Sequence, residues 1–239
     1  MYKKIIALMA VLAFTACNTG PKIPLVLKLS KGFEQTLVRK IASTGRFSTK
    51  TYYTEIHYRV NDVTKDSLYT ITATMKWVHY DDTQSNIHYD SASDKQLGTP
   101  SPLVEGLRSS IDKEYTFTIN RYGNIIAQNG EPKIPIPTMS LLPLEFPNEP
   151  VPLHEKWFYS HDTRQDSDKN YFMMTDIKDG KIYVATAQSS AQDMGSLLLG
   201  AGQATGEYVL DEATGRCISL SIESKDEILG DFSFTIEER

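Results

Sequence analysis

The sequence predicts a mostly β fold behind an export leader: a large curled antiparallel sheet or half-open barrel built from two similar meanders, with one or two short helices. Residues 23–239 repeatedly alternate apolar and polar positions, rich in β-branched and aromatic types, which favours strands. Asn, Asp and Gly clusters separate these segments as turns do. The 13 tyrosines and nine phenylalanines supply enough apolar surface for a packed core. A sheet of this size must protect its edges, which favours full or partial closure.

The first 16 residues have the layout of a secretory signal peptide. Lys3 and Lys4 precede the apolar run Ile5–Phe14, and small residues stand before Cys17. The apolar run is about half as long as a membrane-spanning helix requires. We therefore expect a leader over 1–16 and an acylated Cys17, the alternative being an ordinary secretory signal followed by a cysteine by chance.

The segment 14–17, Phe-Thr-Ala-Cys, resembles the lipobox of bacterial lipoproteins, although Phe14 stands where Leu is usual. The resemblance implies that Cys17 carries acyl chains, palmitate among them, and that 17–22 is a lipidated tether. More than one acyl chain anchors a protein stably to a membrane. Residues 18–22 lack the acidic run typical of surface export, so we expect an outer-membrane location facing the periplasm.

Cys217 is the cysteine that remains once Cys17 is acylated, so an internal disulfide is not expected. It lies in an alternating strand that puts Ile218, Leu220 and Ile222 on one face and Cys217 on the other. Cys217 is either a small strand residue or a catalytic nucleophile, and the absence of a neighbouring histidine in the sequence favours the first.

The first half of the domain, residues 23–130, is expected to begin with strands. Ile23, Leu25, Leu27 and Leu29 alternate with a mixed set, as in a half-buried strand. The expected strands cover 23–30, 32–41, 49–60 and 67–80. In the last, simple alternation puts one set of residues on a single face: Tyr69, Ile71, Ala73, Met75 and Trp77.

A loop, a helix and a hairpin complete that half. Residues 81–101 are polar and rich in turn formers, which predicts a loop. Pro102 begins a short helix in which Leu103, Leu107 and Ile111 have helical spacing. A hairpin is then expected around 121–124.

A connection rich in proline joins this half to a second one, residues 153–239. Residues 131–152 hold seven of the 11 prolines, and proline cannot donate to a ladder. The two halves share an order of features: paired strands, a leucine cluster (103–107 and 197–199) and a final hairpin. We expect a single β domain over 23–239 made of two pseudo-repeats, unless the likeness is only that of any two meanders.

Four short segments, together with Cys17, carry a resemblance to a known family. They are Leu27–Phe33, Phe117–Ile125, Pro150–Trp157 and Gly206–Gly215. With these segments the chain resembles an uncharacterised Bacteroidota lipoprotein family defined by a domain of unknown function. The resemblance implies an exported, lipid-anchored β protein and brings no catalytic residues with it.

Two short segments of the sequence combine histidine with aspartate, the residue types that bind metals or transfer protons. His79–Asp82 and His88–Asp90 would suit a metal or acid-base site, or would be solvated residues at a strand end. The other histidines, His57, His154 and His161, have no zinc-ligand spacing. The glycine-rich segment 200–206 lacks the lysine of a phosphate loop. We therefore expect no catalytic residue, metal or cofactor.

The charge balance and the expected fold limit the function. With a net charge of −5 and no basic block, the chain is not expected to bind nucleic acid. A curled sheet lined with Leu, Ile, Met and aromatic residues favours a non-catalytic binding or carrier module for an apolar ligand. The alternative is a structural or protein-interaction component of the outer membrane.

Acylation of Cys17 can be tested by fractionation. We expect Cys17→Ser to lose its acyl chains and to leave the membrane fraction after a salt wash, because it no longer carries buried alkyl groups. Cys217→Ser, the matched control, should stay with the membrane. A mature N-terminus with an unmodified thiol in mass spectrometry would contradict the prediction.

Overall fold

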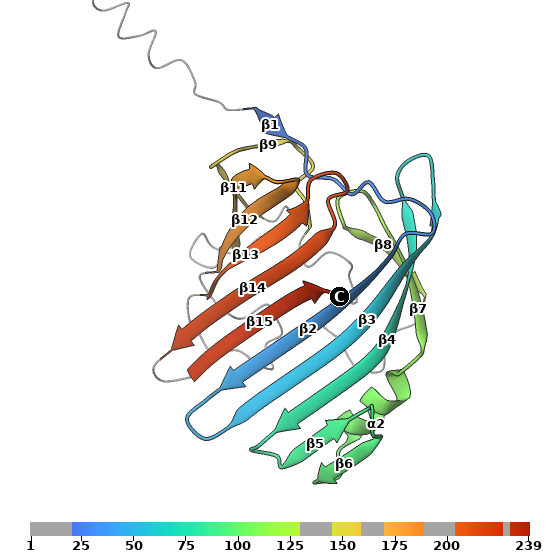
Figure 1. Cartoon of the computed structure of the whole chain (residues 1–239), viewed down its shortest axis with the longest axis vertical. Helices are drawn as coiled ribbons and strands as arrows, with labels where there is room; N and C mark the ends of the chain where they lie inside the picture. Colours follow the sequence, from blue (N-terminus) through green and yellow to red (C-terminus); the bar gives the residue numbers. More distant parts are fainter. Residues whose placement is uncertain (1–20, 130–144, 159–169, 189–203, 227–229) are drawn as a thin grey trace, which may run out of the picture.

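The computed structural model describes residues 21–129, 145–158, 170–188, 204–226 and 230–239. A 13-stranded antiparallel sheet dominates it, and the sheet is curled and open rather than closed into a barrel (Figure 1). The predicted fold class is confirmed. Period-two alternation with β-branched and aromatic residues explains why so much of the chain is strand.

The first half of the chain supplies seven strands of this sheet and the helix α2. Their bounds are β2 Glu34–Thr44, β3 Thr49–Val63, β4 Tyr69–Asp82, β5 Ile87–Asp90, β6 Lys95–Gly98, α2 Pro102–Ser110, β7 Glu114–Ile119 and β8 Ile125–Asn129.

The second half supplies the other six strands. Their bounds are β10 Lys156–Phe158, β11 Asn170–Lys178, β12 Lys181–Gln188, β13 Ala204–Asp211, β14 Cys217–Asp226 and β15 Gly230–Glu238. A separate pair of two-residue strands, β1 Lys22–Ile23 and β9 Val151–Pro152, lies at the end of the sheet where the described chain begins (Figure 1).

The strand order runs β10-β11-β12-β13-β14-β15-β2-β3-β4-β5-β6. The last strand of the chain, β15, pairs with β2 over eight residue pairs, so the two halves form one continuous sheet. Strand β4 is shared along its length: 69–74 pair with β7, and 79–82 pair with β5. The sheet therefore branches at β4, and α2 packs beside the branch.

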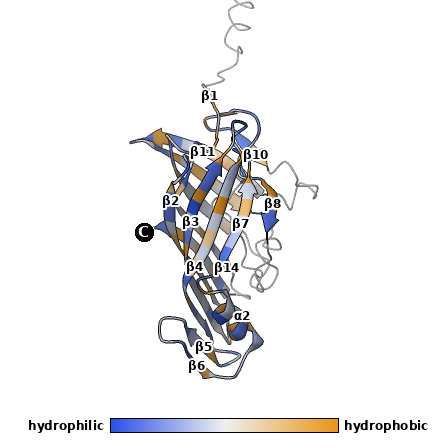
Figure 2. Cartoon of the chain, turned by 90° about the vertical axis from the view of Figure 1, so that its right-hand side faces the viewer, coloured by the Kyte–Doolittle hydropathy of each residue, from blue (hydrophilic) through white to orange (hydrophobic). Residues whose placement is uncertain are grey.

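The two faces of the sheet differ in polarity. We call inner the face that carries Leu37, Ile56 and Ile71, each fully buried, and outer the opposite face. In side view the apolar and polar residues alternate along the curved strands (Figure 2). One large apolar cluster occupies most of the inner face, and a smaller one, made of Met75, Val78, Ile87, Tyr89, Val104 and Leu107, lies under α2.

The segment 24–30 is not the strand that its alternation predicts. Leu25, Leu27 and Leu29 are buried as expected, but the backbone bonds to two different turns instead of one ladder. The Leu27 N–H donates to the carbonyl of Arg121 at 2.8 Å, and the Lys28 N–H donates to that of Thr214 at 2.9 Å. The apolar pattern set the buried side, while tertiary contacts set the backbone partners.

Other local predictions have mixed outcomes. Residues 81–101 are not a loop, because the short hairpin β5–β6 lies within them. The helix is confirmed: the Ser101 side chain accepts the Leu103 N–H as an N-cap, and Pro102 occupies the first turn. The hairpin at 121–124 is confirmed, with Gly123 at positive φ.

Two β-bulges move residues to the face opposite to the predicted one. In β14, Leu210 pairs with Cys217 and Val209 pairs with Ser219, so Ile218 is an extra residue and Cys217 falls on the buried inner face. In β4, Ile56 pairs with Met75 and Glu55 with Trp77, which turns Trp77 outward. An inserted residue reverses the alternation beyond it.

Several predicted features lie outside the described residues. These are the leader 1–16, Cys17 with most of its tether, the leucine cluster 197–199, and most of the proline-rich connection. The pseudo-repeat therefore stays a prediction. In the described part of the chain, no helix combines the length and apolar character needed to cross a membrane.

The role of the N-terminal segment in the core can be tested by truncating a side chain. Leu27→Ala is expected to lower the free energy of unfolding by about 2–5 kcal/mol, because Leu27 is 2% exposed. Leu97→Ala, at a position that is 64% exposed, is the matched control and should change it by about 0.5 kcal/mol or less. Equal effects in chemical denaturation would place 24–30 outside the core.

Candidate functional site

Four polar side chains lie on the inner face along β3 and at one position of its neighbour β2. They are Arg39 on β2 with Tyr52, Thr54 and Tyr58 on β3, and we call this group the inner-face polar strip. Arg39 is 4% exposed and Thr54 is 1% exposed. A charged or hydroxylated side chain at such a depth costs free energy unless another polar group compensates it.

Strand register brings the strip together. Arg39 lies directly opposite Thr54, and Ile41, the next inner-face residue of β2, lies opposite Tyr52. The Arg39 Nη2 donates to the Tyr58 hydroxyl at 2.6 Å, and its guanidinium carbon lies 5.9 Å from the centre of the Tyr58 ring. These contacts hold the guanidinium beside Tyr58.

Two hydroxyl groups of the strip are buried without a hydrogen-bond partner in the described part of the chain. They belong to Tyr52 and Thr54. Burial raises the pKa of the Tyr52 phenol strongly, and the nearby charge of Arg39 offsets only part of that rise. Tyr52 therefore keeps its proton and can donate it in a hydrogen bond.

Apolar residues lie between and beside the members of the strip. Leu37 and Ile56 belong to the large cluster, and Val78 belongs to the smaller cluster under α2. Half-buried Tyr80 packs against that smaller cluster. The inner face thus carries a cation and hydroxyl groups interspersed with fully buried apolar side chains.

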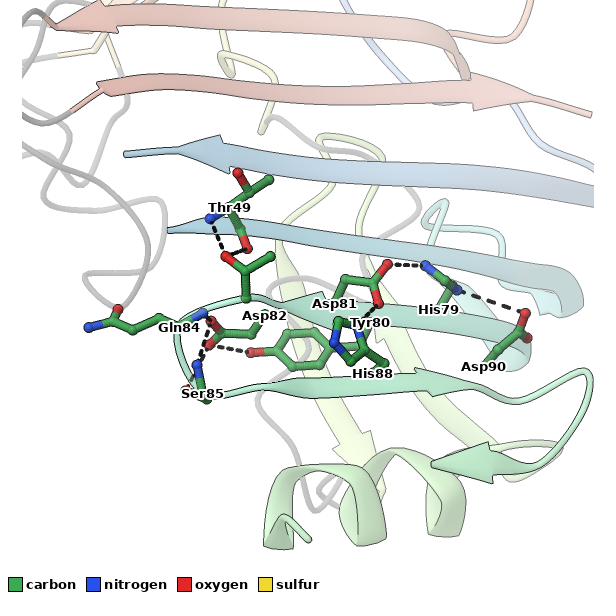
Figure 3. A network of polar contacts seen from close by, with 10 residues as sticks. Thr49, His79, Tyr80, Asp81, Asp82, Gln84, Ser85, His88 and Asp90 are labelled. Atoms are coloured by element: carbon green, nitrogen blue, oxygen red, sulfur yellow. Dashed lines mark hydrogen bonds and ion pairs between the residues drawn. The ribbon is translucent and has the colours of Figure 1, made fainter. Parts of the chain in front are cut away.

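The outer face carries a second polar cluster, on β4 and β5. His79 Nε2 lies 2.6 Å from Asp81 Oδ2, and His88 Nδ1 lies 2.8 Å from Asp81 Oδ1 (Figure 3). Asp90 Oδ2 is 3.8 Å from the other nitrogen of His79. Burial alone would raise the pKa of the Asp81 carboxyl, but contacts with the two imidazoles hold it below its ordinary value.

Aromatic side chains surround this outer cluster. The Trp77 Nε1 donates to Asp90 Oδ1 at 2.9 Å, and the Trp77 and His79 rings stack with centroids 6.1 Å apart. Tyr53 contacts both rings from β3. Each oxygen of Asp81 contacts an imidazole, one from β4 and one from β5. The cluster therefore links these two neighbouring strands through side-chain hydrogen bonds.

Asp82, next in the chain, faces inward and closes the β4–β5 turn. Its side chain is 3% exposed and lies 3.3 Å from Lys50 Nζ. The Gln84 N–H and the Ser85 hydroxyl donate to it at 2.9 and 3.1 Å. Burial alone would raise the pKa of Asp82, but these hydrogen bonds and Lys50 lower it.

The structure brings together only some of the candidate residues from the sequence. His79, Asp81, His88 and Asp90 meet as described, through the β4–β5 pairing. Among the described residues, no group of three His, Cys, Asp or Glu side chains has an arrangement that would hold a metal ion.

The remaining candidates lie elsewhere. His57 contacts Thr36 and Glu34, His154 lies near β11, and His161 is outside the described residues. Burial raises the pKa of the Cys217 thiol to about 12, so this cysteine is a protonated thiol at neutral pH rather than a thiolate. Residues 204–206 of the glycine-rich segment belong to β13, and the rest of that segment is not described.

The inner-face polar strip was missed by sequence reasoning. Arg39, Thr54 and Tyr52 occupy positions where alternation requires the buried face, and that mismatch was the available signal. The chain matches no protein-family model and no curated protein. The functional argument therefore rests on the site itself.

The Asp82 contacts predict a pH-dependent stability. Asp82→Asn should lower the free energy of unfolding by about 1–3 kcal/mol at neutral pH, because it removes a charged acceptor from Lys50 and Ser85. The depressed pKa means that the ionised carboxylate stabilises the fold above its unfolded pKa of about 3.9. The difference from the wild type should shrink as pH falls through the lower folded pKa.

Asp112→Asn is the control for this prediction. Asp112 is 68% exposed and pairs with Lys76 at 2.9 Å, and such surface pairs contribute about 0–1 kcal/mol. A loss for Asp82→Asn that is no greater than this control, or that does not change with pH, would count against the buried carboxylate network.

Proposed function

We propose that this chain is a lipid-anchored envelope protein that carries an apolar ligand on the inner face of its sheet. In this proposal Cys17 provides the membrane anchor, with the folded domain on the periplasmic side of the outer membrane. The role is non-catalytic: the sheet binds, shields and releases the ligand. The domain needs no cofactor and binds no nucleic acid.

One observation carries the proposal: the buried, unpartnered hydroxyls of Tyr52 and Thr54. A buried hydroxyl without a partner in the described part of the chain costs about 1–3 kcal/mol relative to a satisfied one. Valine would fill the Thr54 position with the same shape and without that cost. A polar atom on a bound ligand would supply the hydrogen-bond partner that the described residues do not give these hydroxyls.

Apolar side chains at the sheet edges support the same role. On β8, the last strand of the branch that leaves β4 through β7, Ile125 and Ile126 are 51% and 57% exposed. On β10, at the other end, Phe158 is 43% exposed. Apolar rims on an open sheet suit the entry and exit of a ligand with an alkyl chain.

A second candidate function, docking of a protein partner, has a different observation behind it. Phe47 is 87% exposed in the turn between β2 and β3, and Leu97 is 64% exposed on β6. Both lie toward the end of the sheet opposite the described N-terminus (Figure 1). Crosslinking from Phe47 that recovers only monomer would remove this candidate.

Ligand binding is tested with the Cys17→Ser chain, which has no acyl chain of its own to compete. We expect 1-aminoanthracene to bind and hexadecanol to displace it, with about one site per chain. Thr54→Val should weaken hexadecanol binding about tenfold by removing a hydrogen bond. The same change should keep or raise the stability of the unliganded protein, because a buried unsatisfied hydroxyl is gone.

Thr51→Val is the matched control, since Thr51 lies on the same strand and faces outward opposite Asp81. It should leave hexadecanol binding unchanged. Failure of hexadecanol to displace the probe from the wild-type inner face would reject the carrier role. Equal binding by Thr54→Val and the wild type would show that the hydroxyl does not serve the ligand.

A further inference from the structure

We infer that the β7–β8 hairpin is a membrane-contacting surface: Ile125 and Ile126 lie in the headgroup region of the bilayer that holds the acylated Cys17. This inference rests on the lipid anchor of the proposed function and adds the surface of the domain that meets the bilayer. The partner is the lipid surface itself, and the contact lies outside the inner face of the sheet.

The exposure of β8 is the first argument. All five residues of this strand are exposed, and none is charged. Ile125 and Ile126 are 51% and 57% exposed, so two adjacent large apolar side chains meet water. The other two terminal strands of the sheet, β6 and β10, each carry a lysine, as strand edges in water commonly do. Strand β8 lacks that protection, which favours apolar surroundings for its side chains.

The link between this hairpin and the anchor is the second argument. The Leu27 N–H donates to the Arg121 carbonyl at 2.8 Å, so the segment that leads away from the anchor bonds directly to the hairpin turn. Leu27 is the tenth residue after Cys17, and ten residues span at most about 35 Å when fully extended. Leu27 is itself buried, which fixes this attachment point to the core. The hairpin therefore stays within reach of the bilayer surface.

The residues around the hairpin turn are the third argument. Arg121 is exposed and Tyr122 is half-buried, and the Arg121 Nη2 donates to the Tyr122 hydroxyl at 2.7 Å. Lys28, which follows Leu27, is also exposed. Tyrosine and basic side chains suit the boundary between lipid and water, because each joins an apolar stem to a polar end. They would lie beside headgroup phosphates while the two isoleucines reach the acyl boundary.

The charges of the outer face argue against contact through that face. Glu207, Glu223 and Glu237 alternate with buried residues of β13, β14 and β15, so they point outward, and all three are exposed. Anionic headgroups would repel carboxylates on that face. The domain therefore turns β8, and not the outer face, toward the bilayer.

The test measures how close single labelled positions come to the bilayer. Ala127→Cys on β8, Glu223→Cys on the outer face and Phe47→Cys in the β2–β3 turn are made in the full acylated chain and labelled with a thiol-reactive NBD dye. Cys17 is blocked by its acyl group in this chain, and Cys217 is 0% exposed, so the wild type is the blank. The chains are placed in vesicles of phosphatidylethanolamine and phosphatidylglycerol that carry a nitroxide on the headgroup.

The nitroxide should quench the label at 127 at least about threefold more than the label at 223 or 47, because interfacial apolar groups lie roughly 5–10 Å into the headgroup boundary. Adding Ile125→Asp and Ile126→Asp to Ala127→Cys should remove that excess, since moving a charge out of water is costly. The acyl anchor keeps this variant on the vesicles. Leu97→Asp, at an apolar position on β6 that is 64% exposed, is the matched control and should leave quenching at 127 unchanged.

The outcomes separate this inference from the proposed function. Equal quenching at 127, 223 and 47, or stronger quenching at 223 or 47, would overturn the membrane-contacting hairpin while leaving the anchor intact. Quenching at 127 that survives the two aspartates would show that the tether alone brings the hairpin close, and would also overturn the inference. Chains that do not stay with the vesicles would reject the lipid anchor itself.

Discussion

The pairing of β15 with β2 is the constraint on which the rest of the structure depends. It joins the last strand of the chain to the first long one, so that two meanders become one sheet with one inner face. It also sets Ile236 directly beside Arg39. Without this pairing Arg39 would lie on an edge strand in contact with water, and the polar strip would be a surface feature.

The sheet accommodates polar groups differently on its two faces. On the outer face, Asp81 meets two imidazoles and Asp90 meets Trp77, so these polar groups have hydrogen-bond partners beside solvent. On the inner face the hydroxyls of Tyr52 and Thr54 lack such partners in the described chain. Because buried polar groups are normally hydrogen-bonded, the two inner-face hydroxyls are the exception on this sheet that the proposed ligand would explain.

Alternation in the sequence predicted the fold class, the long strands and the capped helix, because these depend on local periodicity. It placed Cys217 and Trp77 on the wrong faces, because a bulge reverses the pattern and depends on the partner strand. It also predicted a strand over 24–30, which was wrong because a buried apolar face does not specify which backbone groups the segment bonds to. Alternation could have placed Arg39, Tyr52 and Thr54 on the buried face, but not side by side, because their proximity depends on which strands become neighbours.

The central claim is that the inner face holds the ligand, and a crystal of the protein with a terminally brominated hexadecanol tests it most directly. The account predicts anomalous bromine signal on the inner face, within the apolar clusters that flank Arg39 and Thr54. Bromine on the outer face near Trp77, or none on the protein, would contradict it.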